Sequence, residues 1–274
     1  MAFSTNEVCP MPAEANARAI ETELADGVLR IRLAKPEKMN ALTEADMDAL
    51  AAALASAAVD ANVRCLLLTG LGRAFCAGRD ISSAGPGEDA GRILRRHVNP
   101  MLLALHRLPQ PTIAVVNGAA MGVGLGLALA CDIVYVGESA KFSSPFARLG
   151  AALDSGGHYF LPRRLSPGRA MELIYTGDVI DGAEAVRLGL ADRLAPDGVL
   201  QAAAAALAQR IADGPQSAFQ AQKALLRNAG SLSLSEVLER EAKIQADLAR
   251  TPEYAEGIAA FQARRPPRFR EGAQ

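Results

Sequence analysis

Residues 111–142 read PTIAVVNGAAMGVGLGLALACDIVYVGESAKF, and this stretch decides the fold class. Residues 113–116 form a continuous apolar run after a proline, which predicts a strand buried on both faces. The Gly/Ala-rich segment over 121–130 predicts a helix, and residues 132–136 and 140–142 predict two further strands. Strands that alternate with helices in this way indicate βαβ units and a largely parallel sheet.

The same alternation extends toward the N-terminus. Asp26-Gly27 lies between two runs of alternating polarity, 20–24 and 28–33, and this pattern predicts a β-hairpin. Thr43 is a suitable N-cap for a helix that extends to about Val59. Residues 65–69 are apolar throughout and predict another strand buried on both faces.

The second half of the chain changes in character. A glycine-marked loop is predicted over 70–87 and an amphipathic helix over 89–108, but from Gly198 onward the pattern is helical. Four helices are predicted there, over 200–212, 216–228, 234–250 and 252–264. We therefore predict three parts: a disordered N-terminus (1–18), an α/β core (19–197) and a helical C-terminal region (198–274).

Composition excludes several classes of function. The chain has 274 residues, is 50% hydrophobic, and carries 29 Lys and Arg against 30 Asp and Glu, a formal net charge of −1. This balance does not favour a nucleic-acid or membrane-surface partner. The cysteines are scattered without metal-ligand spacing, so neither a disulfide framework nor a metal site is expected: Cys9, Cys65, Cys76 and Cys131. Residues 1–18 lack the apolar stretch of a signal peptide, and we expect a cytoplasmic protein.

Three segments place glycines beside predicted strands: 74–81 (AFCAGRDI), 117–126 (NGAAMGVGLG) and 144–158 (SPFARLGAALDSGGH). Glycines at such positions let another group approach backbone N–H donors closely. The second segment lacks the GxGxxG spacing of a dinucleotide site and does not follow the first strand, so a nicotinamide cofactor is not expected.

Together these segments resemble the crotonase (enoyl-CoA hydratase/isomerase) superfamily. The similarity continues through RAMELIYTGDVIDGAEAVRLGLADRL at 169–194 and TPEYAEGIAAFQARRPPRF at 251–269, so it covers residues 20–269. The resemblance implies an α/β fold with a crotonase-like ββα spiral core, and a helical C-terminal region that assembles the chain as a homotrimer or as a dimer of trimers. It also implies an acyl-CoA substrate and no separate cofactor.

The resemblance assigns roles to individual residues. The backbone N–H groups of Arg79 and Val123 would form an oxyanion hole for the thioester carbonyl, where fixed donors stabilise developing negative charge. The family's contacts with the substrate and its coenzyme A portion map onto six residues: Lys38, Ala77, Asp80, Ile81, Phe146 and Leu149. Two basic features have a second interpretation. Lys38 could be a solvated loop charge. The arginines over 264–270 could either bind the phosphates of coenzyme A or form a solvated chain end.

The sequence departs from the hydratases of this family. These enzymes carry two glutamates, at the positions that Gly126 and Phe146 occupy here. The carboxylate that remains is Asp154, which matches the aspartate of dienoyl-CoA isomerases, ring-1,2-epoxyphenylacetyl-CoA isomerases and 4-chlorobenzoyl-CoA dehalogenases. Adding water to a double bond requires both a base and an acid, whereas a shift of the double bond requires one proton-transfer group. The pattern therefore favours an enoyl-CoA isomerase with Asp154 as its catalytic residue.

Four alternatives stay open. Asp154 could be the N-cap of a helix, as aspartate often is. It could instead be a nucleophile, with His97 or His106 as its base, in a hydrolase or dehalogenase. The chain could also be a family member with weak or no hydratase activity, or a binding protein for coenzyme A esters. His158 follows Asp154 by four residues and would tune it if both lay on one helix face.

Overall fold

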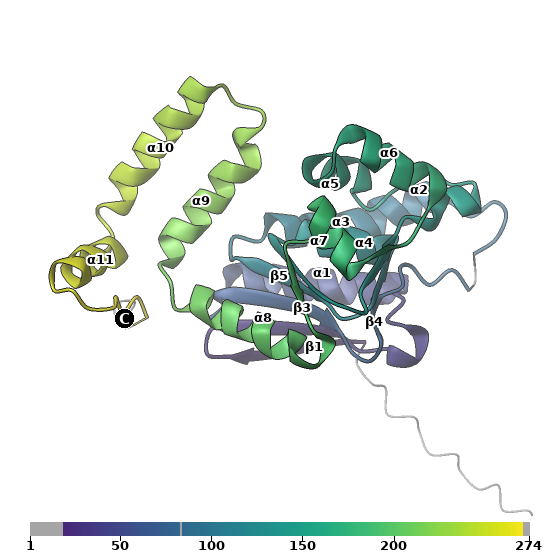
Figure 1. Ribbon diagram of the computed structural model, residues 1–274, viewed down its shortest axis with the longest axis horizontal. Coiled ribbons are helices and arrows are strands. Elements are labelled where there is room, and N and C mark those ends of the chain that lie inside the picture. Colours follow the sequence, from purple (N-terminus) through teal and green to yellow (C-terminus); the bar gives the residue numbers. More distant parts are fainter. Residues whose placement is uncertain (1–18, 83, 271–274) are drawn as a thin grey trace, which may run out of the picture.

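The computed structural model describes residues 19–82 and 84–270, and the prediction of disorder over 1–18 lies outside these residues (Figure 1). Two sheets form the core. The larger sheet has six strands, which in spatial order are β1 (Ile20–Ala25), β2 (Val28–Leu33), β3 (Cys65–Gly70), β5 (Thr112–Val116), β7 (Ile133–Gly137) and β10 (Arg193–Ala195). Only β1 runs antiparallel to its neighbour, through the predicted hairpin at Asp26-Gly27.

Helices cover both faces of the larger sheet, which explains the continuous apolar runs of β3 and β5. Leu66 and Leu68 pack with residues of α1 (Glu44–Val59) and α3 (Asn99–Arg107). Leu67, which points to the opposite face, packs with residues of α8 (Asp197–Ala212). The predicted helices and strands of this layer are confirmed.

A second, smaller sheet was not predicted. Its strands are short and lie in the order β4 (Ala74–Cys76), β6 (Ala119–Met121), β8 (Lys141–Ser143) and β9 (Ile180–Asp181). The predicted loop over 70–87 therefore contains a strand, and the helix expected from residue 121 begins at Val123, after β6. A strand of three residues, such as β4 or β6, is too short to show the alternation of polar and apolar residues by which strands are recognised.

The remaining helices lie around the two sheets. They are α2 (Ala90–Ile93), a π-helical turn (Leu94–Val98), α4 (Val123–Ala130), α5 (Gly157–Arg164), α6 (Pro167–Thr176) and α7 (Gly182–Leu188), with 3-10 turns at Pro36–Lys38 and Pro145–Leu149. The helix predicted over 89–108 is confirmed, and the π-helical turn lies between α2 and α3.

The C-terminal helices extend away from the core (Figure 1). They are α9 (Gln216–Ala229), α10 (Leu234–Leu248) and α11 (Pro252–Gln262), close to the predicted ranges. The described part of the chain contains no helix that is both long and apolar enough to cross a membrane. The α/β class with a helical C-terminal region is thus confirmed, with two sheets in place of one.

Candidate active site

The second sheet brings the three glycine-marked segments together. β6 pairs in parallel with β4 on one side and with β8 on the other. Because parallel strands end at the same edge of a sheet, the segments that follow β4, β6 and β8 leave from one edge. These segments carry Arg79, Val123 and Phe146, residues that the sequence analysis selected.

The backbone at Arg79 is held in a defined orientation. Leu42 donates its N–H to the Gly78 carbonyl oxygen over 2.9 Å, and its own carbonyl oxygen accepts the Asp80 N–H over 2.8 Å. In this parallel bridge the N–H and C=O of Arg79 point away from Leu42. The Arg79 N–H therefore faces the opposite side, where α4 begins.

The amide of Val123 lies close to the same segment. Gly78 has φ 108°, which favours glycine, and a Cβ added there would lie 3.8 Å from the Val123 nitrogen. Val123 is the first residue of α4, so its N–H has no acceptor within the helix. Its side chain packs in the hydrophobic core and leaves only the backbone group on this side. The Val123 amide thus lies beside Gly78, the residue that precedes Arg79.

Asp154 does not cap a helix. The N-cap of α5 is Gly156, in the left-handed conformation with φ 74° and without a side-chain cap. The Asp154 side chain instead accepts a hydrogen bond from the Ser155 hydroxyl, with 2.6 Å between Oγ and Oδ1. The N-cap interpretation is therefore wrong, because α5 begins after Asp154 and leaves its carboxylate free for other contacts.

The environment of Asp154 favours proton uptake. Burial raises the pKa of its carboxyl group, and this effect exceeds the lowering by the Ser155 hydroxyl and by the positive charge of Arg79. A carboxylate with a raised pKa is a stronger base than one in water. Asp154 is therefore suited to accept a proton.

Gly126 is the residue of α4 that packs against the segment containing Asp154. A Cβ added at Gly126 would lie 2.7 Å from the Ser155 Cβ and would overlap the Ser155 carbonyl oxygen. No side chain, and in particular no glutamate, fits there without moving the backbone. Phe146 occupies the second glutamate position, and its ring lies 3.6 Å from a Cβ added at Gly122, beside the start of α4. The surroundings of the candidate site are therefore apolar on this side.

The residues predicted to contact coenzyme A lie around the first motif. The Lys38 ammonium contacts the Asp80 carboxylate over 3.2 Å, while 57% of the Lys38 side chain stays exposed to solvent. Hydrogen bonds from Ser82, together with the one from Lys38, lower the pKa of Asp80 to about 2. The Ala77 N–H donates to the Met39 carbonyl oxygen over 2.9 Å. Among the apolar residues predicted to contact the substrate, Ile81 and Leu149 have exposed side chains.

None of the three histidines contacts Asp154 through a described hydrogen bond. His97 is buried, with Nδ1 at 2.7 Å from Asp48 and Nε2 at 2.9 Å from Glu44, two carboxylates of α1. His158 is exposed on α5, and because Asp154 precedes that helix, the predicted shared face is wrong.

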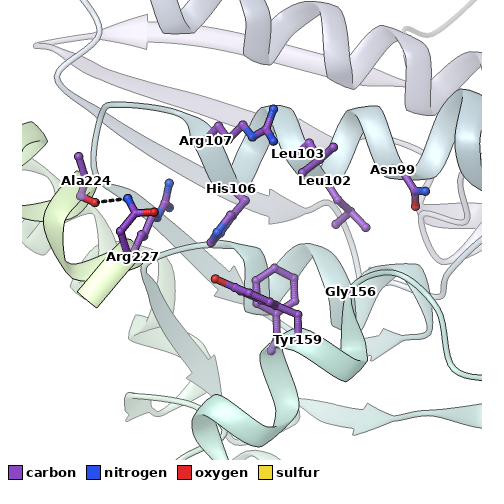
Figure 2. A pocket seen from close by; sticks show the side chains of 11 residues that line it. Asn99, Leu102, Leu103, His106, Arg107, Gly156, Tyr159, Ala224 and Arg227 are labelled. Atoms are coloured by element: carbon purple, nitrogen blue, oxygen red, sulfur yellow. Dashed lines mark hydrogen bonds between the residues drawn. The ribbon is translucent and has the colours of Figure 1, made fainter. Parts of the chain in front are cut away.

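His106 lies in a cavity of about 690 Å³ between α3, α5 and α9 (Figure 2). Its ring packs edge-on against Tyr159 and Phe160. Burial lowers the pKa of His106, and the nearby Arg227 lowers it further. Gly156 borders this cavity, but Asp154 is not among the residues that line it.

Sequence reasoning missed one partner in the site. The two terminal guanidinium nitrogens of Arg79, Nη1 and Nη2, contact the Glu88 carboxylate, nine residues along the chain. The two residues lie on a loop without helical or strand periodicity, so no spacing rule indicates the pair. In the basic tail, Arg265 and Arg270 contact Glu256 and Asp213 of the same chain.

Known proteins share this fold and much of this sequence. A family model described as enoyl-CoA hydratase/isomerase matches residues 23–272. The "Probable enoyl-CoA hydratase" of Rhodobacter capsulatus is 39% identical over 251 residues, which span 91% of this chain and 97% of that protein. The 1,2-epoxyphenylacetyl-CoA isomerase of Escherichia coli is 36% identical over 255 residues, with the same shares of 91% and 97%. The crystal structure of an enoyl-CoA hydratase from Bacillus anthracis superposes with a TM-score of 0.88, at 32% identity over 92% of this chain and 98% of that one.

Proposed function

The chain belongs to the enoyl-CoA hydratase/isomerase family, the crotonase superfamily, and we propose that it is an enoyl-CoA isomerase in which Asp154 transfers the proton. The observation that carries this proposal is the packing of Gly126 against Ser155. That contact excludes a side chain from one glutamate position of the hydratases, and Phe146 occupies the other. Asp154 is the carboxylate that remains at a catalytic position predicted from the family.

The proposed reaction needs one acid–base group. Asp154 removes a proton from C2 of a 3-enoyl-CoA, and the electron pair moves into the thioester to form a dienolate. The negative oxygen accepts hydrogen bonds from the N–H groups of Arg79 and Val123. Asp154 then returns the proton to C4, which gives the conjugated 2-enoyl-CoA without loss or gain of atoms. The raised pKa of Asp154 makes it a stronger base for the first transfer, the removal of the C2 proton.

Opening of a ring epoxide with rearrangement is a related reaction that the same groups could support. The relative from Escherichia coli carries the name of such an activity, and our proposal includes both kinds of isomerisation. A nucleophilic role for Asp154 is less well supported. His97, one possible base, is held between Glu44 and Asp48 of α1, and His106 packs against aromatic rings.

We further propose that the acyl-CoA substrate contacts the residues predicted from the family, and that the C-terminal helices assemble copies of the chain as a trimer or a dimer of trimers. Lys38, Ala77, Asp80 and Ile81 lie around the first motif, where they could contact the coenzyme A portion. Phe146 and Leu149 would contact the acyl group through apolar surface.

Replacement of Asp154 by asparagine tests the assignment. We expect Asp154→Asn to reduce isomerisation by about 10³-fold, because loss of a general base typically costs 10²- to 10⁴-fold, while acyl-CoA binding is retained. Rates on 3-enoyl, 2-enoyl, dienoyl and ring-epoxide esters and a binding titration would measure both effects. The matched control is Asp178→Asn, which changes an exposed aspartate on the loop after α6. Faster hydration of 2-enoyl-CoA than isomerisation by the native enzyme would contradict the proposal.

A further inference from the structure

The side chain of Arg79 forms a two-point ion pair. Its Nη1 and Nη2 atoms lie 2.9 Å and 2.7 Å from the two carboxylate oxygens of Glu88. The Arg79 side chain is 22% exposed and that of Glu88 27%, and Glu88 as a whole residue is exposed to solvent. A bidentate pair between planar groups fixes orientation as well as distance. The pair therefore restrains the direction of the Arg79 side chain.

Arg79 is held at both of its ends. Its backbone is fixed by the bridge to Leu42, and the far end of its side chain is fixed by Glu88. The peptide group between Gly78 and Arg79 carries the N–H proposed for the oxyanion hole, and Gly78 lies beside the Val123 amide. A donor that is fixed before the reaction needs no reorganisation when charge develops.

Arg79 and Asp154 lie on two segments that pack against the same helix, α4. Gly78 packs against the first turn of α4, while Ser155 packs against Gly126 in the same helix. In agreement with this placement, the Arg79 charge acts to lower the pKa of Asp154, against the effect of burial.

Other charges act on Arg79 from the elements around it. Glu88 belongs to its own loop and acts most strongly, raising the pKa of the guanidinium, and Glu44 at the start of α1 acts in the same direction. Arg92 of α2 lies 3.7 Å from Glu44. Asp154 therefore faces a positive charge that a carboxylate partly neutralises.

We propose that Arg79 is a positioning residue, whose pairing with Glu88 holds the Arg79 amide in place and limits the positive charge that Asp154 faces. This inference rests on the proposed isomerase function. It assigns to the Arg79 side chain a role that is separate from that of its backbone N–H. It also assigns a role in the reaction to Glu88, which does not touch the substrate.

Two substitutions should act in opposite directions. Arg79→Gln removes the positive charge, so the pKa of Asp154 rises and the acidic limb of the kcat/KM profile moves to higher pH. Glu88→Gln removes the neutralising carboxylate, so the pKa of Asp154 falls and the same limb moves to lower pH. Arg79→Lys keeps the charge but loses the two-point geometry, and we expect about a tenfold lower kcat with the limb little changed.

The pKa of Asp154 can also be measured without turnover, by ¹³C NMR of the carboxyl carbon in the ligand-free enzyme, assigned with Asp154→Asn. If isomerase activity is absent but the two NMR titrations move in opposite directions, the proposed reaction fails and the charge relation stands. The control is Arg187→Gln, which breaks the exposed Arg187–Glu184 pair of α7 and should move neither profile. Titrations of Arg79→Gln and Glu88→Gln that coincide, or that move in the same direction, would overturn the proposal.

Discussion

The two-sheet core and the three C-terminal helices differ in how completely they bury their apolar residues. All residues of β3, β4 and β5 are buried. Among the described residues, α10 has no buried side chain, and α9 and α11 have one each. Large apolar side chains are exposed on these helices: Leu226, Leu234, Leu238, Ile258 and Phe261. The core completes its packing within one chain, whereas the helices present apolar surface of the kind that marks an interaction site.

The junction between the two regions is polar. The Asp132 carboxylate, just before β7, contacts Lys223 over 2.6 Å and Arg227 over 2.8 Å, both on α9. It also accepts hydrogen bonds from the backbone N–H and the hydroxyl of Thr112. Burial lowers the pKa of Lys223, and Asp132 opposes this effect. Charged contacts fix a direction, so Asp132 helps to set how α9 leaves the core.

One added methyl group should have opposite effects in the two regions. At Gly126 a Cβ overlaps the Ser155 backbone, so we expect Gly126→Ala to destabilise the fold by about 3 kcal/mol and to displace Asp154. At Gly230, at the end of α9, a Cβ meets nothing within 4 Å, and φ is −65°. There Gly230→Ala should be neutral or stabilise by about 0.5 kcal/mol, because alanine restricts the unfolded chain.

Urea unfolding of both variants, together with the isomerase assay, would measure the difference. Equal losses of stability in the two variants would show that the chain is packed no more tightly around Gly126 than around Gly230.

This contrast also explains which parts of the fold the sequence could predict. Long elements such as β3 and α1 carry a clear hydrophobic pattern, because one or both faces are buried over several residues. The short strands β4 and β6 carry none, and β4 is packed closely against the glycine backbones of Gly118 and Gly124. Local patterns are therefore informative only where an element is long enough to repeat.

The candidate site divides in a similar way. The resemblance to a family predicts Arg79, Val123 and Asp154, and in the structure Gly78, which precedes Arg79, lies beside the Val123 amide. The N-cap interpretation of Asp154 failed because Gly156 adopts the left-handed conformation, which a local sequence pattern does not reveal. The contact with Glu88 joins two residues nine positions apart outside any helix or strand, and no local sequence pattern indicates such a pair.

The polar junction predicts the second largest effect. Asp132→Asn places an amide among cationic and N–H donors and leaves the largely buried Lys223 without its counter-charge. We expect a loss of about 2 kcal/mol, since breaking one partner of a buried pair is costly, together with faster hydrogen exchange in α9. The control Asp247→Asn removes an exposed pair with Arg250 and should change stability by less than about 0.5 kcal/mol. Unchanged exchange in α9 would mean that apolar contacts alone hold this helix.

The exposed apolar surface of α10 predicts the smallest effect on the core. If copies of the chain assemble through the C-terminal helices, as we propose, Leu238→Glu should lower the mass measured by sedimentation, because a charge would be buried in the interface. Hydrogen exchange in β3 and β5 should stay the same, since Leu238 does not belong to the core clusters. Val59 supplies the matched control: it ends α1 in the core region and is 87% exposed. Val59→Glu should leave the mass unchanged, because a charge on a solvated surface costs little. If the mass falls equally in both variants, the interface between copies includes the core. The contrast between a core that buries its apolar residues within one chain and C-terminal helices that expose theirs would then no longer hold.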